Sequence, residues 1–138
     1  MVDTISKKRR SENMRRIRSK GMRPEIAVRR LVHSMGYRFR LHSLKLPGKP
    51  DIVLSRLRKI VDVRGCFWHQ HKGCVDAHIP KSSTSYWRSK LRRNVRRDRE
   101  NSKRLRKLGW RVFVVWECEI VAHGNPELSA RLARFLAQ

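Results

Sequence analysis

The sequence predicts an α/β domain in which helices flank a central mixed β-sheet. Two observations support this prediction. Helical and extended patterns alternate along the chain as helix, hairpin, long helix, strand and helix. The 138 residues are enough to enclose one hydrophobic core, but they leave little room for a second. We therefore expect a basic N-terminal arm over residues 1–20, followed by a single domain over residues 21–138.

The first predicted helix begins at Pro24, because proline is favoured in the first turn of a helix. Its apolar residues recur at helical spacing, and the stripe ends near Gly36. The members of this stripe are Ile26, Ala27, Val28, Leu31 and Met35. A short strand over residues 37–41 is expected to follow.

A β-hairpin is predicted next. Residues 46–50 contain two prolines and a glycine, which indicates a turn. Residues 51–54 and 59–64 are apolar runs separated by a basic turn, as in two antiparallel strands. Residues 65–84 have little regular pattern, and we expect them to form a structured loop.

A long helix is predicted over residues 85–108, and it ends at Gly109, since glycine is the usual residue just after a helix C-terminus. Residues 111–116 form an apolar, β-branched run that is typical of a strand buried on both faces. A last helix is expected over residues 126–137. The inward side of the long helix is expected to carry Trp87, Leu91, Val95, Ser102, Leu105 and Leu108.

The charge of the chain indicates a polyanionic partner. Lysine and arginine number 35 against 11 acidic residues, for a net charge of +24, and nucleic acid is the leading candidate. A membrane-surface protein would need an apolar anchor or span, and neither is evident. Residues 1–20 lack the apolar stretch of a secretory signal, so we expect a cytoplasmic protein. These residues are either an arm that orders on its partner or a solvated tail.

Two short acidic segments could bind a divalent cation. Asp51 opens one strand of the hairpin, and Asp62, Val63 and Arg64 lie in the other. Side-chain alternation puts Asp62 and Arg64 on one face of the sheet. Paired carboxylates suit Mg²⁺, and a nearby cation can hold a phosphate, which is the pattern of the PD-(D/E)xK nuclease motif. That motif is short and degenerate; in the alternative interpretation Asp51 caps a turn and Asp62 pairs with a surface arginine.

All the cysteines of the chain, Cys66, Cys74 and Cys118, can be accounted for by one metal site. Together with one histidine of the loop they could form a tetrahedral Cys3His zinc site that ties the loop to the end of a strand. The spacing does not decide whether His69 or His71 is the fourth ligand. The other histidine could then act near the magnesium ion. Buried free thiols are the alternative.

Aromatic residues beside the basic helix could enter a DNA duplex. Phe67 and Trp68 are adjacent in a polar loop, and Trp87 lies at the start of the long helix. Aromatic side chains next to a basic face can stack on bases or wedge into a base step. For Trp110 and Trp116, within or beside the predicted buried strand, we favour ordinary core packing.

Two further acids are candidates for the site. Asp98 falls on the inward face of the long helix, where a carboxylate needs a metal, a bound water or a cation, and a buried ion pair with an arginine is the alternative. Glu25 lies in the first turn of the first helix, where helix electrostatics alone would explain an acid. Basic residues between Arg88 and Lys107 surround these candidates with a phosphate-binding face.

Five segments, in chain order, together form a recognisable pattern: Leu46–Asp51, Gly65–His69, Asn94 to Arg99, Leu108–Val112 and Trp116–Cys118. They resemble the very short patch repair (Vsr) endonucleases, which nick DNA beside the thymine of T:G mismatches that arise from deaminated 5-methylcytosine. The resemblance runs from about Ser11 to Cys118 and implies a restriction-endonuclease-like core in a bacterial, nucleoid-associated protein. It also implies that the substrate is duplex DNA with a T:G mismatch, and we expect the chain to be a monomer and a MutL-type repair protein to be a partner.

The resemblance also implies roles for single residues. Asp51 and the main-chain carbonyl of Val63 would bind Mg²⁺, His69 would be the catalytic histidine, and Asp98 and Glu25 would support the waters of the metal. The implied zinc ligands are Cys66, His71, Cys74 and Cys118. The implied aromatic wedge is Phe67, Trp68 and Trp87.

The chain departs from the family pattern at Asp62 and Arg64, where the best-known member has an aromatic residue and a histidine. Asp62 could therefore be an additional metal ligand, and Arg64 could contact DNA. Two other functions use the same residues. One is a restriction or homing-type endonuclease that cuts matched DNA, and the other is a non-catalytic zinc protein that binds nucleic acid.

Overall fold

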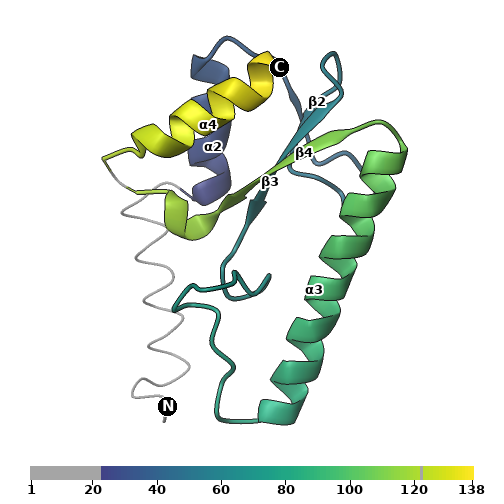
Figure 1. The fold of residues 1–138 in the computed structure, drawn as a ribbon, viewed down its shortest axis with the longest axis vertical. Coiled ribbons are helices and arrows are strands. Elements are labelled where there is room, and N and C mark those ends of the chain that lie inside the picture. The colour runs from purple at the N-terminus through teal and green to yellow at the C-terminus, as the bar shows by residue number, and fades with distance from the viewer. Residues whose placement is uncertain (1–22, 122) are drawn as a thin grey trace.

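A four-stranded mixed sheet lies between α-helices in the computed structural model, which describes residues 23–121 and 123–138 (Figure 1). This architecture is the α/β fold that the sequence predicts. In chain order the elements are α2 (Pro24–Ser34), β1 (Arg40–Leu41), β2 (Ile52–Leu54), β3 (Lys59–Arg64), α3 (Thr84–Lys107), β4 (Arg111–Trp116), the 3-10 helix η1 (Glu117–Glu119) and α4 (Pro126–Ala137).

The strands are ordered β1-β2-β3-β4 across the sheet. β1, β2 and β3 pair in antiparallel fashion, and the predicted hairpin is β2 and β3, with Ile52 opposite Val61. β3 and β4 are parallel, with Val63 opposite Val115. Parallel strands need a long crossover connection, and the loop after β3 together with α3 provides it.

Side-chain alternation divides the strands between two hydrophobic clusters. α2 and α4 cover one face of the sheet, where Val61 packs in the larger cluster with Val63 at its margin. α3 covers the opposite face, where Ile60 packs against Leu105. Because Asp62 and Arg64 alternate with Val61 and Val63, they share the α3 face with Ile60, as the sequence predicts.

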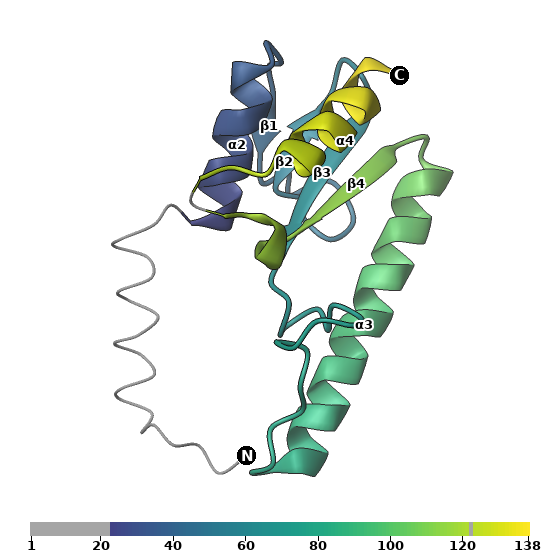
Figure 2. The ribbon, with the colours of Figure 1, turned by 60° about the vertical axis from the view of Figure 1, so that its left-hand side comes forward.

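α3 has 24 residues, whereas β3 and β4 have six each, and the first turns of α3 extend past the sheet beside the loop of residues 65–83 (Figure 2). Its C-terminus has the expected cap: Gly109 has φ 92°, and the Gly109 N–H donates to the Arg106 carbonyl oxygen. The Trp110 N–H donates to the Leu105 carbonyl oxygen, which completes a Schellman motif. The helix is therefore rigidly joined to β4.

Three details of the sequence prediction were wrong. The strand at 111–116 is not buried on both faces: β4 is an edge strand of this sheet, and only Val115 is fully buried. β1 is shorter than the predicted strand over 37–41. Leu108 does not face the core, since it is the C-cap of α3 and 52% exposed. The long helix and the last helix lie within one residue of their predicted bounds.

A buried lysine joins the sheet to the last helix. Lys59 is 2% exposed, and its Nζ donates to the main-chain oxygens of Phe135, Leu136 and Gln138 at 2.6, 3.1 and 2.7 Å. Burial, and then the charge of Arg111, lowers the pKa of Lys59. Lys59 thus satisfies carbonyl groups that the end of α4 leaves without partners in the helix.

The proposed basic arm over residues 1–20 lies outside the described residues. Within residues 23–121 and 123–138, no helix is both long enough and apolar enough to cross a membrane.

Candidate functional site

A pocket of about 210 Å³ lies between the sheet and α3. β2 begins where its antiparallel neighbour β3 ends, so Asp51 meets Asp62 and Arg64 at one end of the hairpin. His69 from the loop and Asp98 from α3 complete the polar wall of the pocket. The structure therefore brings together five of the residues that the sequence indicated.

The turn before β2 closes one side of this pocket. Gly48 has φ 79°, and a Cβ atom there would lie 3.0 Å from the side-chain nitrogen of Asn101 on α3. A larger residue would strain the backbone and push the turn away from the helix. The Pro-Gly turn is therefore part of the site.

Asp51 is held by the neighbouring strand. Its Oδ2 accepts a hydrogen bond from the Val63 N–H at 3.0 Å. The pKa of Asp51 is raised from 3.8 to about 6, chiefly by burial, while the hydrogen bond from Val63 opposes the shift and the charges of Asp62 and Glu25 add to it. The pocket thus concentrates negative charge that a bound cation would relieve.

Asp62 and Arg64 form an ion pair inside the pocket. Arg64 Nε donates to Asp62 Oδ2 at 3.1 Å, and Arg64 Nη2 reaches Ser102 Oγ at 3.5 Å. The arginine is 5.9 Å from the centre of the Trp116 ring. Asp62 thus pairs with an arginine, but with the largely buried Arg64 rather than with the surface arginine of the alternative interpretation, and the pair lines the same pocket as Asp51.

His69 and Asp98 are joined by a short hydrogen bond, with 2.6 Å between His69 Nδ1 and Asp98 Oδ2. An ionised carboxylate only accepts, so Nδ1 carries a proton and the neutral ring keeps Nε2 as an acceptor. The partner of Asp98 is therefore an imidazole rather than the arginine of the alternative interpretation. The predicted position of Asp98 on the inward side of the long helix is confirmed.

Glu25 lies in the first turn of α2 and is not part of the pocket wall. Its Oε2 lies 3.5 Å from Nη2 of Arg29, one helical turn later. It is close enough to Asp51 for its charge to raise the pKa of that carboxyl. Glu25 thus influences the site through its charge.

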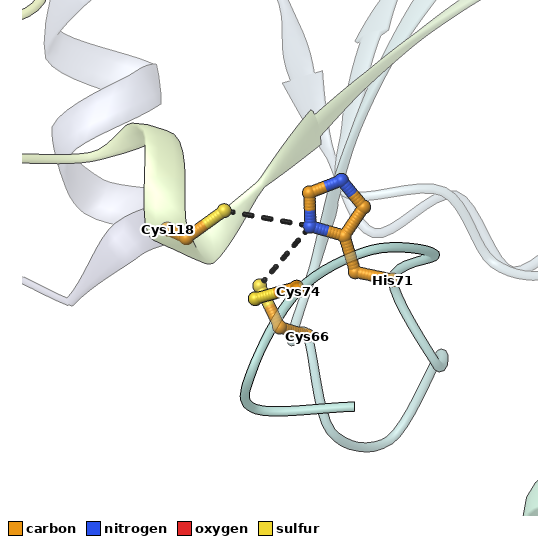
Figure 3. A group of neighbouring side chains, drawn as sticks. All are labelled: Cys66, His71, Cys74 and Cys118. Carbon is orange, nitrogen blue, oxygen red and sulfur yellow. Dashed lines mark hydrogen bonds between the residues drawn. The ribbon is translucent and has the colours of Figure 1, made fainter. Parts of the chain in front are cut away.

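A second site consists of Cys66, His71, Cys74 and Cys118, whose side chains converge (Figure 3). All four ligand atoms lie within 4.8 Å of one another, and His71 Nδ1 is 3.7 Å from Cys66 Sγ and 3.4 Å from Cys118 Sγ. Ligands of a tetrahedral zinc ion would be separated by roughly 3.5–3.8 Å. The cluster could hold a metal ion, and it contains His71 rather than His69.

Without a metal ion, this cluster favours the neutral form of its thiols. Burial raises the pKa of Cys66 to about 12, and it also raises the pKa of Cys118, with further contributions from neighbouring thiols. A divalent cation would reverse this effect by stabilising the thiolates. Thiolate and imidazole are donors that zinc prefers. The donor set therefore fits the expected metal.

The loop that carries these ligands also carries Phe67 and Trp68, which form an aromatic cluster with Trp87 of α3. The ring centroids of Phe67, Trp68 and Trp87 lie between 5.2 and 5.8 Å from one another, and Trp68 is 48% exposed. Asn94 of α3 donates to the Trp68 carbonyl oxygen at 3.1 Å and holds the loop against the helix. The structure thus gathers the three predicted wedge residues into one cluster.

Sequence reasoning missed three residues near these sites. Trp116, which we had interpreted as ordinary core, stacks on His71 with ring centroids 4.2 Å apart and an interplanar angle of 9°. Tyr86 is 55% exposed and extends the aromatic cluster beside Trp87. His42 lies close to Asp51. The motif Trp116–Cys118 could have indicated the first, but no local pattern indicates His42.

Comparisons with known proteins agree with this arrangement. A model of the family described as DNA mismatch endonuclease Vsr matches residues 2–75, more than half of the chain. The chain is 49% identical over 136 residues to the type II nicking enzyme V.XorIIP of Xanthomonas oryzae pv. oryzae, covering 99% of this chain and 98% of the relative.

Two further relatives lead to the same family. The chain is 43% identical to the type II nicking enzyme V.NmeAIP of Neisseria meningitidis, covering 87% of this chain and 85% of the relative. It is 40% identical to the DNA mismatch endonuclease Vsr of Escherichia coli, covering 87% of this chain and 76% of the relative. With a family match over half of the chain and these identities, the chain belongs to the Vsr family of DNA mismatch endonucleases and is itself a DNA endonuclease.

Proposed function

We propose that this endonuclease nicks the thymine strand at T:G mismatches in duplex DNA, as the first step of very short patch repair, and that it requires Mg²⁺. One observation carries the proposal: paired carboxylates and the His69–Asp98 pair share one pocket, and Phe67 and the exposed Trp68 lie on the same loop as His69. The Escherichia coli relative, named a DNA mismatch endonuclease, supports the substrate. We also propose that the sheet and its helices are a restriction-endonuclease-like core.

The residues that would hold magnesium are Asp51, the main-chain carbonyl of Val63, and Asp62 as an additional ligand. The closeness of Asp62 and Glu25 to Asp51 supports this assignment: burial is the main cause of the raised pKa of Asp51, their charges add to it, and a cation would offset that repulsion. Magnesium bound there would stabilise the negative charge on the phosphate and make a bound water more acidic. The further role proposed for Glu25 and Asp98 is to support the waters around the metal.

His69 is proposed as the group that takes the proton of the attacking water. Its Nδ1–H donates a hydrogen bond to Asp98, so the lone pair of Nε2 is available to act as a base. Asp98 acts as a positioning residue, because it fixes both the tautomer and the direction of the ring. Attack in line with the leaving oxygen would leave a 5′-phosphate and a 3′-hydroxyl.

Arg64 is proposed to contact the DNA phosphate. Its Nε is bound to Asp62, which leaves other guanidinium donors for a phosphate oxygen in the pocket. The stack over Trp116 restricts its side chain. A positioned guanidinium can stabilise the charge that develops on the phosphate during attack.

The cluster of Cys66, His71, Cys74 and Cys118 is proposed to hold a structural Zn²⁺. The ligands lie before and after His69 in the loop, and Cys118 lies in η1, directly after β4. Closing this site would fix the loop to the sheet, and with it the catalytic histidine and the wedge. A zinc ion bound there would support catalysis by holding these residues in place.

Phe67, Trp68 and Trp87 are proposed to enter the duplex at the mismatch. Separating stacked base pairs costs less at a mismatched pair, so insertion of aromatic rings favours mismatched over matched DNA. The exposure of Trp68 supports this role. Basic residues of α3 would bind the flanking phosphates.

The setting of this activity is also proposed. We expect a monomeric protein of the bacterial cytoplasm, associated with the nucleoid through its DNA binding, and a MutL-type repair protein as a partner.

The test is strand-resolved cleavage of a duplex that carries one T:G mismatch, next to the matched T:A and C:G duplexes, with Mg²⁺ or with EDTA. We expect nicking of the thymine strand only, at the mismatch and with Mg²⁺ only. Cleavage of both strands of matched DNA would instead support a restriction-type enzyme. Tight binding without cleavage under any metal condition would contradict the proposal.

A further inference from the structure

The Asp51 carboxylate has a neighbour that the mechanism above does not use. His42 follows β1 directly, and its Nδ1 lies 3.9 Å from Asp51 Oδ1. The His42 side chain is 52% exposed, so it lies at the rim of the site rather than in the core. The opposite carboxylate oxygen, Oδ2, accepts the Val63 N–H. The two oxygens of Asp51 therefore face different N–H groups.

The backbone of His42 is held in a conformation that few residues adopt. Its φ is 49°, in the left-handed region that costs about 1–2 kcal/mol for a residue with a Cβ atom. The His42 N–H donates to the main-chain oxygen of Asp51 at 3.1 Å, just beyond the Leu41–Ile52 pair of the sheet. This backbone conformation is therefore secured by Asp51 itself, the residue that the imidazole faces.

Arg29 determines which ring nitrogen of His42 carries the proton. Arg29 Nη2 lies 3.0 Å from His42 Nε2. A guanidinium group can only donate, so Nε2 is the acceptor and the proton of the neutral ring lies on Nδ1. Nδ1 is the nitrogen that faces Asp51. Glu25, one turn earlier on α2, lies 3.5 Å from the same Arg29 nitrogen and helps to hold it.

We propose that His42 is a positioning residue for Asp51, set in its tautomer by Arg29. Its Nδ1–H orients Oδ1 while the Val63 N–H orients Oδ2, so the carboxylate is fixed from both sides before metal binds. At 3.9 Å the contact is longer than a direct hydrogen bond and acts through the N–H dipole or one bridging water. The inference rests on the proposed role of Asp51 as a magnesium ligand.

This arrangement gives Glu25 a defined connection to the site. Glu25 holds Arg29, Arg29 fixes the His42 tautomer, and His42 orients Asp51. Groups that orient metal ligands in this way affect metal affinity or activity by about 10–100-fold. Removal of the imidazole should therefore weaken Mg²⁺ binding without unfolding the protein.

The variants are chosen to separate the imidazole from the backbone. His42→Gly removes the side chain and suits a positive φ. His42→Asn keeps an N–H donor and also tolerates the left-handed conformation. His33→Asn, on the exposed face of α2, is the matched control. Calorimetry measures Mg²⁺ affinity without DNA, and nicking assays measure the half-maximal Mg²⁺ concentration separately from the rate at saturating Mg²⁺.

We expect His42→Gly to weaken Mg²⁺ binding by about 10-fold or more. His42→Asn should recover most of that loss, the control should match the parent, and melting temperatures should stay unchanged. Equal weakening in the Gly and Asn variants, or Mg²⁺ affinity in His42→Gly equal to that of the parent, would overturn the inference. A lower melting temperature with unchanged Mg²⁺ affinity would also overturn it, since His42 would then be only structural.

The tautomer provides a second readout that needs neither metal nor activity. Nitrogen-15 NMR of the His42 ring should show a protonated Nδ1 and an unprotonated Nε2. Arg29→Met should move the proton towards Nε2, whereas Arg30→Met, at the neighbouring exposed position, should not. A protonated Nε2 in the parent protein would overturn the inference.

These results are distinguishable from a failure of the proposed function. If Asp51→Asn still nicks DNA at the parent rate, the assignment of Asp51 fails. If Asp51→Asn is inactive but His42→Gly binds Mg²⁺ like the parent, only the role of His42 fails.

Discussion

The carboxylate pocket and the Cys/His cluster are both candidate metal sites, but they are held in different ways. Asp51, Asp62 and Arg64 belong to a hairpin whose register is fixed by backbone hydrogen bonds. Cys66, His71 and Cys74 lie on a loop without helix or strand, and Cys118 comes from a distant segment of the chain. The first site should therefore keep its shape without metal, while the second should depend on metal for its shape.

Because the two sites are held in different ways, mutations in them should have different effects on activity and stability. Changes in the carboxylate pocket should remove activity and leave stability nearly unchanged, because the hairpin stays folded. Changes in the Cys/His cluster should lower stability first, and activity should fall as a consequence.

The largest expected effect is that of Asp51→Asn. We expect nicking to fall by more than about 10³-fold, since the metal ligand that carries negative charge is lost, while the side chain can still accept the Val63 N–H. Nicking rates at saturating Mg²⁺ and melting temperatures test this. A melting temperature much lower than that of the parent would contradict the expectation that the carboxylate pocket keeps its shape without metal.

His69→Ala should lower the nicking rate by about 10²–10⁴-fold, because the proposed base is lost. Asp98→Asn should have a smaller effect, because it perturbs the tautomer and direction of His69 but keeps the ring in the pocket. Single-turnover rates at saturating DNA test both variants. Loss of DNA affinity with an unchanged rate would contradict these roles.

Cys118→Ala should destabilise the fold, by several kcal/mol if a structural zinc is lost. We expect a lower melting temperature, less bound zinc per chain and parallel loss of nicking. Metal analysis and calorimetric melting are the measurements. Ser55→Ala, in the exposed β2–β3 turn, is a suitable control. An unchanged melting temperature in Cys118→Ala would refute the structural role of the cluster.

The smallest expected effect is a pH dependence of stability that comes from Asp51. Because its folded pKa, about 6, is above its ordinary 3.8, the folded state binds more protons between these values. Without added Mg²⁺, protonation of Asp51 should favour the folded state, and this contribution to the free energy of unfolding is complete below about pH 4. It should be lost as the pH rises through 6, which lowers the free energy of unfolding by on the order of 1–2 kcal/mol.

Urea unfolding of the parent and Asp51→Asn between pH 4 and 7 measures this contribution together with its coupling to Asp62. Titrating groups that do not interact with Asp51 cancel in the difference. The Asn variant should lack it. If the parent instead became more stable relative to Asp51→Asn as the pH rises, the result would contradict the raised pKa of Asp51.

The local pattern of the sequence determined most of the secondary structure. Alternation along residues 59–64 placed Asp62 and Arg64 on one face, and the pattern ending at Gly109 gave the end of α3. The same reasoning overestimated the burial of residues 111–116. An apolar run does not indicate whether its strand will be central or at the edge of a sheet.

Residue chemistry also determined that the cysteines and histidines of the loop form a metal-type donor set. The spacing left open which histidine joins the thiols, because both histidines are equally close to the cysteines in sequence. The family resemblance implied His71, and the tertiary structure places His71 beside the thiols and turns His69 towards Asp98. The contacts of Trp116, Lys59 and His42 were likewise set by the packing of distant segments. Such contacts depend on how strands and helices meet in space, a property that no local pattern records.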